Sequence, residues 1–215
     1  MFSMCKSVVF IICFFHMLIA YAEETIDAVL IRHAVQEPVQ FSYQETRHMQ
    51  LLDMPWKASG KMYMSPAFFI VEQKKPYRLV MASNRTSLWL YDGKNKIRRS
   101  RNISGYSRGG SSLVALMMAL RTGEIETLKE RYTMTLSAKE HQWTLEMIPV
   151  ESAMDKHDAR IVLRGKADQA ADELKIEYAD GNHTFWEFTA EEHTKERSED
   201  VSKQMKTLVK EARGG

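Results

Sequence analysis

The most recognisable chemical motif in the sequence is a candidate nucleophile. Residues 105–109 read Gly-Tyr-Ser-Arg-Gly and match G-x-S-x-G, the strand-to-helix turn that exposes the serine of many hydrolases. The context is unfavourable, because the preceding residues 96–101 are strongly basic and must be solvated, whereas such a turn normally follows a buried strand. A serine hydrolase at Ser107 therefore ranks third among our hypotheses, and we expect the protein not to be an enzyme.

Histidine and cysteine give no sign of a metal or redox site. Six histidines follow residue 22, and none has the H-E-x-x-H or other paired spacing that binds a metal. Both cysteines, Cys5 and Cys13, lie in the N-terminal segment discussed below. We therefore expect neither a metal nor a cofactor, and we expect the core to fold without disulfides.

Methionine is the residue type that most favours a binding function. Eleven of the fourteen methionines follow residue 22. Methionine is flexible and polarizable, so it suits surfaces that accommodate varied apolar guests, although filling an ordinary core is its commoner role. Methionine content alone leaves both interpretations open. The first gains weight because the methionine-bearing strands occur together with a thoroughly apolar helix.

The N-terminus has the pattern of a secretory signal peptide. Lys6 is followed by a nearly unbroken apolar run over residues 7–19, which ends in Ala-Tyr-Ala at 20–22. A retained membrane anchor is the alternative, but an anchor needs about 20 apolar residues. We predict that residues 1–22 are a signal peptide, that residues 23–215 form one domain, and that the protein resides in the periplasm.

The overall composition is that of a globular protein. The sequence has 30 Lys and Arg against 28 Asp and Glu, and 44% of its residues are hydrophobic. It is too apolar and too balanced in charge for a disordered chain, and it lacks the basic excess of a nucleic-acid-binding protein. We therefore expect no nucleic-acid partner. The length suits one domain with a core of its own.

The first half of the chain is dominated by predicted strands. Residues 23–37 carry apolar side chains at three- and four-residue steps, which predicts a helix that ends before Pro38. From residue 39 to 101 the period changes to two, and this period places Met62 and Met64 on one face. The connections are short, so neighbouring strands must be antiparallel.

A basic run over residues 94–101 has two interpretations. Alternation places some of its five cations on one exposed strand face, where they could meet an acidic partner or anionic lipid headgroups. The alternative is a solvated edge strand whose charges prevent aggregation, and we favour this second interpretation.

The second half combines one apolar helix with further strands. Residues 111–120 are apolar nearly all round and predict a helix ended by Gly123; either both of its sides are covered, or one side faces a ligand. Alternation predicts four more strands, around residues 142–147, 160–164, 174–178 and 186–188. The charged tail, residues 190–213, has only a thin apolar stripe and predicts a marginal helix on the surface.

These elements predict an α+β fold that is mainly antiparallel β. The strands share one apolar face rich in methionine and aromatic residues, and a single sheet must cover such a face. Two helices, 23–37 and 111–120, are available for that purpose. We predict an incomplete, unclosed β-barrel with a helical lid across its opening.

Part of the chain resembles the outer-membrane lipoprotein carrier family (LolA-like proteins). The resemblance covers about sixty residues from 41 to 100 and follows the family's progression of motifs. It rests on FSYQETR at 41–47, ASGKMYMSP at 58–66, AFF at 67–69, KPY at 75–77 and SLWLYDG at 87–93.

This resemblance implies an unclosed antiparallel barrel whose hydrophobic cavity holds acyl chains under a helical lid. It also implies transport across the periplasm, from a donor transporter in the inner membrane to an acceptor at the outer membrane. Two positions depart from the family pattern. Ser65 stands where typical carriers have an arginine that ties the lid shut, and residues 69–71 read Phe-Ile-Val where many members read Phe-Arg-Trp.

We hypothesise a monomeric periplasmic carrier that binds lipoprotein acyl chains or a related lipid and moves them toward the outer membrane. The alternative is a periplasmic sensor or adaptor of the same fold that binds a membrane-protein partner. The predicted cavity wall consists of Met62, Met64, Trp143, Leu145, Met147, Ile176, Trp186 and Phe188. The predicted lid residues are Leu113, Leu116, Met117 and Leu120.

Overall fold

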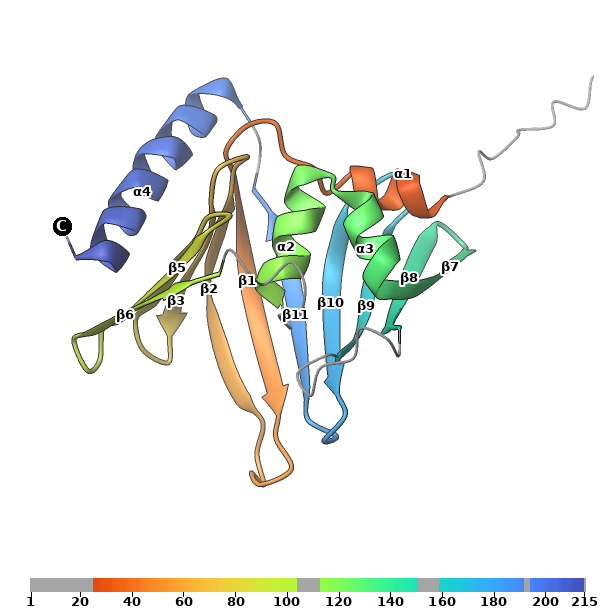
Figure 1. The fold of residues 1–215 in the computed structure, drawn as a ribbon, viewed down its shortest axis with the longest axis horizontal. Coiled ribbons are helices and arrows are strands. Elements are labelled where there is room, and N and C mark those ends of the chain that lie inside the picture. Colours follow the sequence, from red (N-terminus) through yellow and green to blue (C-terminus); the bar gives the residue numbers. More distant parts are fainter. Residues whose placement is uncertain (1–24, 104–112, 151–158, 192–193, 215) are drawn as a thin grey trace, which may run out of the picture.

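A computed structural model describes residues 25–103, 113–150, 159–191 and 194–214 of the chain (Figure 1). Its strands are β1 (Val39–His48), β2 (Trp56–Met64), β3 (Phe69–Lys75), β4 (Leu79–Ser83), β5 (Ser87–Asp92), β6 (Ile97–Asn102), β7 (Tyr132–Lys139), β8 (Gln142–Pro149), β9 (Ala159–Lys166), β10 (Ala171–Tyr178) and β11 (His183–Ala190). Its helices are α1 (Ile26–Ile31), α2 (Leu113–Thr122), α3 (Ile125–Arg131) and α4 (Lys195–Arg213). The predicted signal peptide lies outside the described residues.

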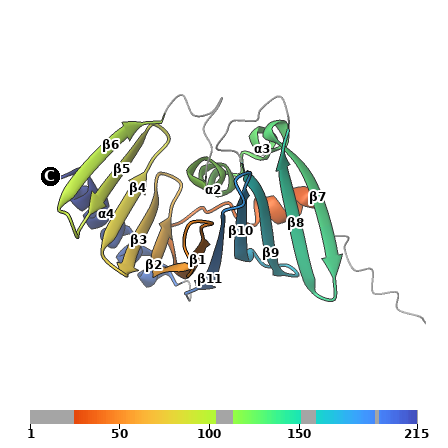
Figure 2. The ribbon, with the colours of Figure 1, turned by 90° about the horizontal axis from the view of Figure 1, so that it is seen from below.

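All eleven strands belong to one sheet, in the order β6-β5-β4-β3-β2-β1-β11-β10-β9-β8-β7. Every neighbouring pair is antiparallel. The end strands β6 and β7 do not pair with each other in the described part of the chain, so the sheet stays open. Figure 2 shows it as an arc, with α2 inside the arc and α4 outside. The predicted fold class, a mainly antiparallel and unclosed barrel with helices, is confirmed.

Alternation along the strands gives the sheet two different faces. On β2, Met62 belongs to the core cluster on the concave face, whereas its neighbour Tyr63 belongs to a second cluster beneath α4. The same division holds on β3, where Phe69 and Val71 lie on the concave face and Ile70 on the convex face. Met62 and Met64 therefore share the concave face, as their spacing predicts.

A glycine allows two strands of the arc to approach closely. The pairing of β2 with β3 shifts register between Ser59 and Gly60. A Cβ atom at Gly60 would lie 2.0 Å from the carbonyl oxygen of Glu72, inside van der Waals contact. No other residue fits here without moving the backbone of β3, so this close approach of β2 and β3 requires a glycine at position 60.

The N-terminal helix is shorter than the predicted range of residues 23–37. It begins after Thr25, whose side chain accepts a hydrogen bond from the Ala28 N–H, and it ends at Ile31. The chain then tightens into a turn with three-residue hydrogen bonds. The N–H of Val35 donates to the carbonyl of Arg121 in α2 instead of continuing the helix. A contact with a distant segment thus ends the helical hydrogen-bond pattern.

Two elements between α2 and β8 were not predicted. Gly123 does close α2, with a positive φ of 69°, but a seven-residue helix, α3, follows almost at once. Strand β7 comes directly after it and forms the end of the sheet. Alternation is present in β7, where Tyr132, Met134 and Leu136 line the concave face, so the signal existed in the sequence.

The prediction of a marginal surface helix at the C-terminus is wrong. Helix α4 has 19 residues, is capped by Thr194 and ends at Gly214 in the left-handed conformation. It buries an apolar stripe made of Val201, Met205, Leu208, Val209 and Ala212. The stripe packs on aliphatic and aromatic residues of the convex face, which alternation alone could not assign to it.

Candidate functional site

The concave face brings all eight predicted wall residues into one apolar cluster. Six of them are buried, namely Met62, Trp143, Leu145, Met147, Ile176 and Trp186. Met64 and Phe188 are partly buried and pack against the same cluster. They come from β2, β8, β10 and β11, which lie far apart in the sequence but line one arc (Figure 2). That these residues hold a ligand stays a prediction.

The predicted lid helix packs directly on this wall. Leu116, Met117 and Leu120 of α2 are buried in the same cluster as the wall residues. The side chain of Leu113 lies outside the described residues. Helix α1 adds Val29 and Leu30, and α3 adds Leu128. The lid is therefore closed in this structure, with its own apolar side chains against the wall.

The two tryptophans of the wall differ in how they are held. The indole N–H of Trp143 donates to the carbonyls of Lys166 (2.9 Å) and Gln169 (3.1 Å). Gly165 makes room for this ring, since a Cβ there would lie 2.6 Å from Trp143 Cζ2. The ring of Trp186 stacks on Tyr43, with 4.9 Å between centroids, but its buried Nε1 has no hydrogen-bond partner among the described residues.

His33 connects α1 to the wall as a neutral side chain. Its Nδ1 lies 2.8 Å from the carbonyl of Val29, and its Nε2 lies 2.9 Å from the N–H of Ala171 in β10. The carbonyl requires a donor and the N–H requires an acceptor, so Nδ1 carries the proton. Burial lowers the pKa of His33, and the nearby cation of Arg32 lowers it further. Its ring edge meets Trp143.

One carboxylate interrupts the apolar concave face. Glu45 of β1 is buried, and burial raises its pKa, while the hydrogen-bonded ion pair with Arg47 opposes that shift. Alternation places Glu45 on the same side as Tyr43, so its position was readable from the sequence. We had not predicted it as part of the site.

Arg121, in the last turn of α2, was also missed. Its side chain is fully enclosed, with 1% of the residue exposed, and one terminal nitrogen donates to the backbone carbonyl of Ser65 at 2.7 Å. This bond ties the lid to the end of β2. In this contact the arginine comes from α2, and Ser65 supplies a backbone oxygen.

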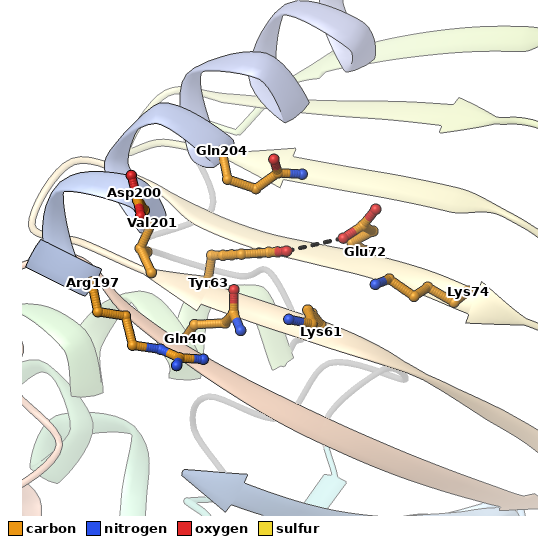
Figure 3. A pocket seen from close by; sticks show the side chains of 9 residues that line it. All are labelled: Gln40, Lys61, Tyr63, Glu72, Lys74, Arg197, Asp200, Val201 and Gln204. Carbon is orange, nitrogen blue, oxygen red and sulfur yellow. Dashed lines mark hydrogen bonds between the residues drawn. The ribbon is translucent and has the colours of Figure 1, made fainter. Parts of the chain in front are cut away.

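A separate hollow of about 400 Å³ lies on the convex side, between the first turns of α4 and the sheet (Figure 3). Its lining is mostly polar or charged, and consists of Gln40, Lys61, Tyr63, Glu72, Lys74, Arg197, Asp200, Val201 and Gln204. Ion pairs of Glu191 with Lys61 and Arg197 hold the rim. Such a lining does not suit an acyl chain.

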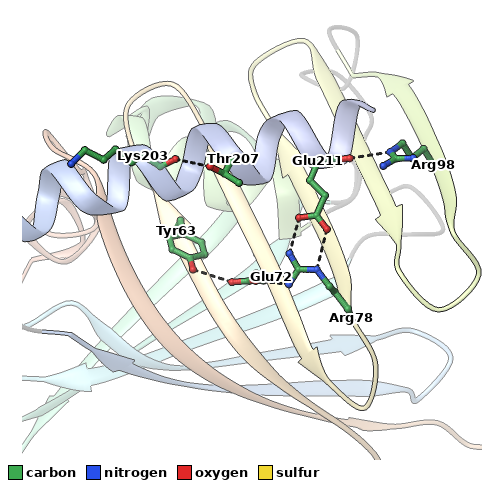
Figure 4. A network of polar contacts seen from close by, with 7 residues as sticks. All are labelled: Tyr63, Glu72, Arg78, Arg98, Lys203, Thr207 and Glu211. Carbon is green, nitrogen blue, oxygen red and sulfur yellow. Dashed lines mark hydrogen bonds and ion pairs between the residues drawn. The ribbon is translucent and has the colours of Figure 1, made fainter. Parts of the chain in front are cut away.

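A chain of polar contacts fixes α4 to the sheet (Figure 4). The hydroxyl of Tyr63 donates to Glu72 at 3.0 Å, and Glu72 pairs with Arg78 at 2.6 Å. Arg78 then donates to both carboxylate oxygens of Glu211 in α4. The bonds to Glu211 are the largest cause of a raised pKa at Arg78. Arg98 of the edge strand β6 completes the contact by donating to the carbonyl of Glu211.

The remaining features considered in the sequence are the serine motif, a metal site, a membrane-spanning segment and the basic run. Ser107 and its motif lie outside the described residues. Within the described ranges, no three histidine, cysteine or acidic side chains are grouped so that they could hold a metal. None of the helices described is both long and apolar enough to span a membrane. The basic strand β6 is exposed along its whole length, in agreement with a solvated edge.

Comparison with known proteins points to one family. The family model described as "Outer membrane lipoprotein carrier protein LolA-like" matches residues 20–177. No curated protein matches the chain. Among solved structures, a LolA superfamily protein from Nitrosomonas europaea is 9% identical with a TM-score of 0.44, and covers 80% of this chain and 94% of its own.

Two further solved structures have similar sequence identities, TM-scores and coverages. An uncharacterized conserved protein from Thermus thermophilus is 14% identical, with a TM-score of 0.46, and covers 80% of this chain and 89% of its own. The lipoprotein LppX from Mycobacterium tuberculosis is 11% identical, with a TM-score of 0.37, and covers 78% of this chain and 96% of its own. These scores carry no statement about what the present chain binds.

Proposed function

The chain belongs to the LolA-like family of outer membrane lipoprotein carrier proteins, and on that premise we propose that it is a periplasmic carrier. It binds the acyl chains of lipoproteins, or of a related lipid, against its concave face and shuttles them toward the outer membrane. It receives its cargo from an inner-membrane donor and delivers it to an outer-membrane acceptor. It works as a monomer and without chemistry of its own.

The observation that carries the proposal is the continuous apolar surface shared by the wall and the lid. Residues from strands β1 to β3 and β7 to β11 contribute to one cluster, together with Leu116, Met117 and Leu120 of α2. When an acyl chain inserts between lid and wall, the apolar contacts between lid and wall are replaced by apolar contacts of each with the acyl chain. The protein therefore loses little when α2 moves outward, while the acyl chain leaves water.

The size of this effect sets how cargo is exchanged. Burying a methylene group contributes about 0.8 kcal/mol, so a fourteen-carbon chain gains on the order of 10 kcal/mol before the cost of moving the lid. Spontaneous release into water is then slow, and release requires a partner that offers another apolar environment. Outward movement of α2 is the gating step for entry and release, and the Arg121 bond to Ser65 is the polar contact that opens during that movement and re-forms afterwards.

Binding is tested with protein purified from the periplasm. We expect native mass spectrometry and lipid extraction to find a bound acyl lipid, and a fluorescent fatty acid to be taken up after delipidation. Leu145→Trp fills the wall and lowers uptake at least about tenfold. Thr144→Trp changes the adjacent residue, which faces the other side of β8, and leaves uptake unchanged. Protein without lipid that also takes up no fatty acid would rule out the proposal.

Transport needs a second assay. Acyl-labelled lipoprotein in inner-membrane vesicles should reach outer-membrane vesicles faster when the protein is added, and Leu145→Trp should slow that transfer. If the protein binds lipid but never accelerates transfer, the binding part of the proposal stands and the carrier part fails.

A further inference from the structure

Arg121 has two nitrogens that no described group satisfies. One terminal nitrogen donates to the Ser65 carbonyl, but Nε and the other terminal nitrogen are buried and have no hydrogen-bond partner in the described part of the chain. Those two nitrogens lie on the same edge of the planar guanidinium group. This edge presents two parallel N–H groups, the arrangement that binds both oxygens of a carboxylate or phosphate.

The charge of Arg121 is also uncompensated. No carboxylate of the described residues forms an ion pair with it. Among the described residues, the acidic side chain whose charge acts on Arg121 is Glu124, which is already bonded to Arg85 at 3.0 Å. Burial lowers the pKa of Arg121, and the positive charge of Arg85 lowers it further. Arginine stays protonated in proteins, so the site encloses a cation that has no paired anion among the described residues.

We propose that this edge of Arg121 binds the anionic head group of the cargo, so that the ligand is an amphiphile carrying a carboxylate or a phosphate. This rests on the proposed lipid-binding function and narrows its substrate class. The free edge takes the two oxygens of the head group, while the remaining nitrogen keeps its bond to Ser65. The buried cation thereby gains the counter-ion that none of the described residues supplies.

The position of Arg121 agrees with such a ligand. It follows Leu116, Met117 and Leu120 on the lid helix, and these residues face the apolar wall. A tail can therefore lie along α2 while its head group reaches the end of the helix. Arg85 next to the site has a side chain that is 69% exposed, so this end lies near solvent. Anion binding here links the lid, the ligand and β2, so bound cargo itself favours the closed lid.

The test compares head groups on one tail. Dodecanoate, dodecyl phosphate and dodecanol displace the neutral dye N-phenyl-1-naphthylamine from the delipidated protein at pH 8. We expect at least one of the two anions to bind about tenfold or more tightly than dodecanol, because each bond to a charged group is strong in a buried site. The tighter anion identifies a carboxylate or a phosphate as the natural head group.

Variants assign the preference to Arg121. Arg121→Met keeps an apolar stem but removes the charged edge, and we expect it to reduce the preference to less than about twofold. Arg78→Met removes the same charge on the convex face, where the guanidinium is fully paired, and it should keep the full preference. An anion preference that survives in Arg121→Met, or equal loss in both variants, would overturn the assignment.

Thermal unfolding separates this role from a purely structural one. Without ligand, Arg121→Met should unfold at the same or a higher temperature than the wild type, because it removes an unpaired buried charge. A structural arginine would instead lower the midpoint when replaced. If all three amphiphiles bind the wild type equally, the lipid-binding function stands and the head-group site is wrong. If none of them binds, the proposed function itself fails.

Discussion

The convex and concave faces of the sheet are both covered by helices, but the covers differ in their polar contacts. Beneath α4, a chain of hydrogen bonds runs from Tyr63 through Glu72 and Arg78 to Glu211. The apolar stripe of α4 is buried as well. Beneath α2, apolar side chains are also buried in one cluster, yet Arg121 and Trp186 keep buried donors without described partners. A satisfied polar network holds α4 in one place, whereas α2 can be lifted without breaking such a network.

This difference shows how one sheet can serve two purposes. Buried polar groups normally find partners, so unsatisfied donors in a native structure require an explanation. Here they lie on the concave face, the face proposed to receive a ligand. The convex face is structural, and its covering helix closes the second core. The predictions below compare changes on the two faces, or two changes within the concave face, and they run from the largest effect to the smallest.

The first comparison uses two buried leucines. Leu208→Ala on α4 should lower the free energy of unfolding by about 2–5 kcal/mol, because the fixed helix cannot close the cavity. Leu116→Ala on α2 should cost less than about 2 kcal/mol, because a movable lid settles into the space. Urea unfolding monitored by circular dichroism measures both. Equal losses would show that the lid is as rigid as α4.

The second comparison uses the two wall tryptophans, which leave similar volumes when replaced by phenylalanine. Trp143→Phe also removes the bonds to Lys166 and Gln169, whereas Trp186→Phe removes an N–H without a described partner. We expect Trp143→Phe to be the more destabilising by about 1–3 kcal/mol in the same urea assay. The reverse order would mean that Trp186 has a partner beyond the described residues.

The third comparison concerns buried charge. Glu72→Gln keeps a group that can bond Tyr63 but removes the charge facing Arg78, so stability should fall by about 1–2 kcal/mol. The expected loss of stability is modest because the Arg78 side chain is 42% exposed and its charge is partly screened by water. Arg121→Met on the concave face should not lower stability. Thermal unfolding of the two variants side by side checks the contrast.

The last prediction is a pH dependence that arises on the concave side. Burial lowers the pKa of folded His33 below the ordinary histidine value of 6.5, so below about pH 6.5 the unfolded chain binds more protons than the folded one. Stability contributed by His33 is therefore complete above that pH and is lost as the pH falls. Unfolding measured from pH 8 to pH 5 should show this loss. In His33→Gln the side chain does not titrate, so the loss of stability toward low pH should be smaller. If stability falls with pH as steeply in this variant as in the wild type, His33 is not its cause.

Much of the fold was predictable because alternation is a local property. The period of two identified most strands and assigned all eight predicted wall residues to one face, which the cluster on the concave side confirms. Strand β7 has the same alternation and could have been recognised. The length of α1 could not, because its end depends on a hydrogen bond from Val35 to Arg121, nearly ninety positions away.

The sequence by itself determined the antiparallel sheet, its apolar inner face, the apolar helix that covers it and the resemblance to a family. Only the tertiary structure decided that α4 covers the convex face, and which polar groups have no partner among the described residues. The physical reason is that periodicity describes one side of an element, whereas burial and hydrogen bonding depend on what packs against it. Arg121 illustrates this: in the sequence it is an ordinary basic residue near a helix end, and only folding encloses it beside Ser65, with no ion-pair partner in the part of the chain that the structure describes.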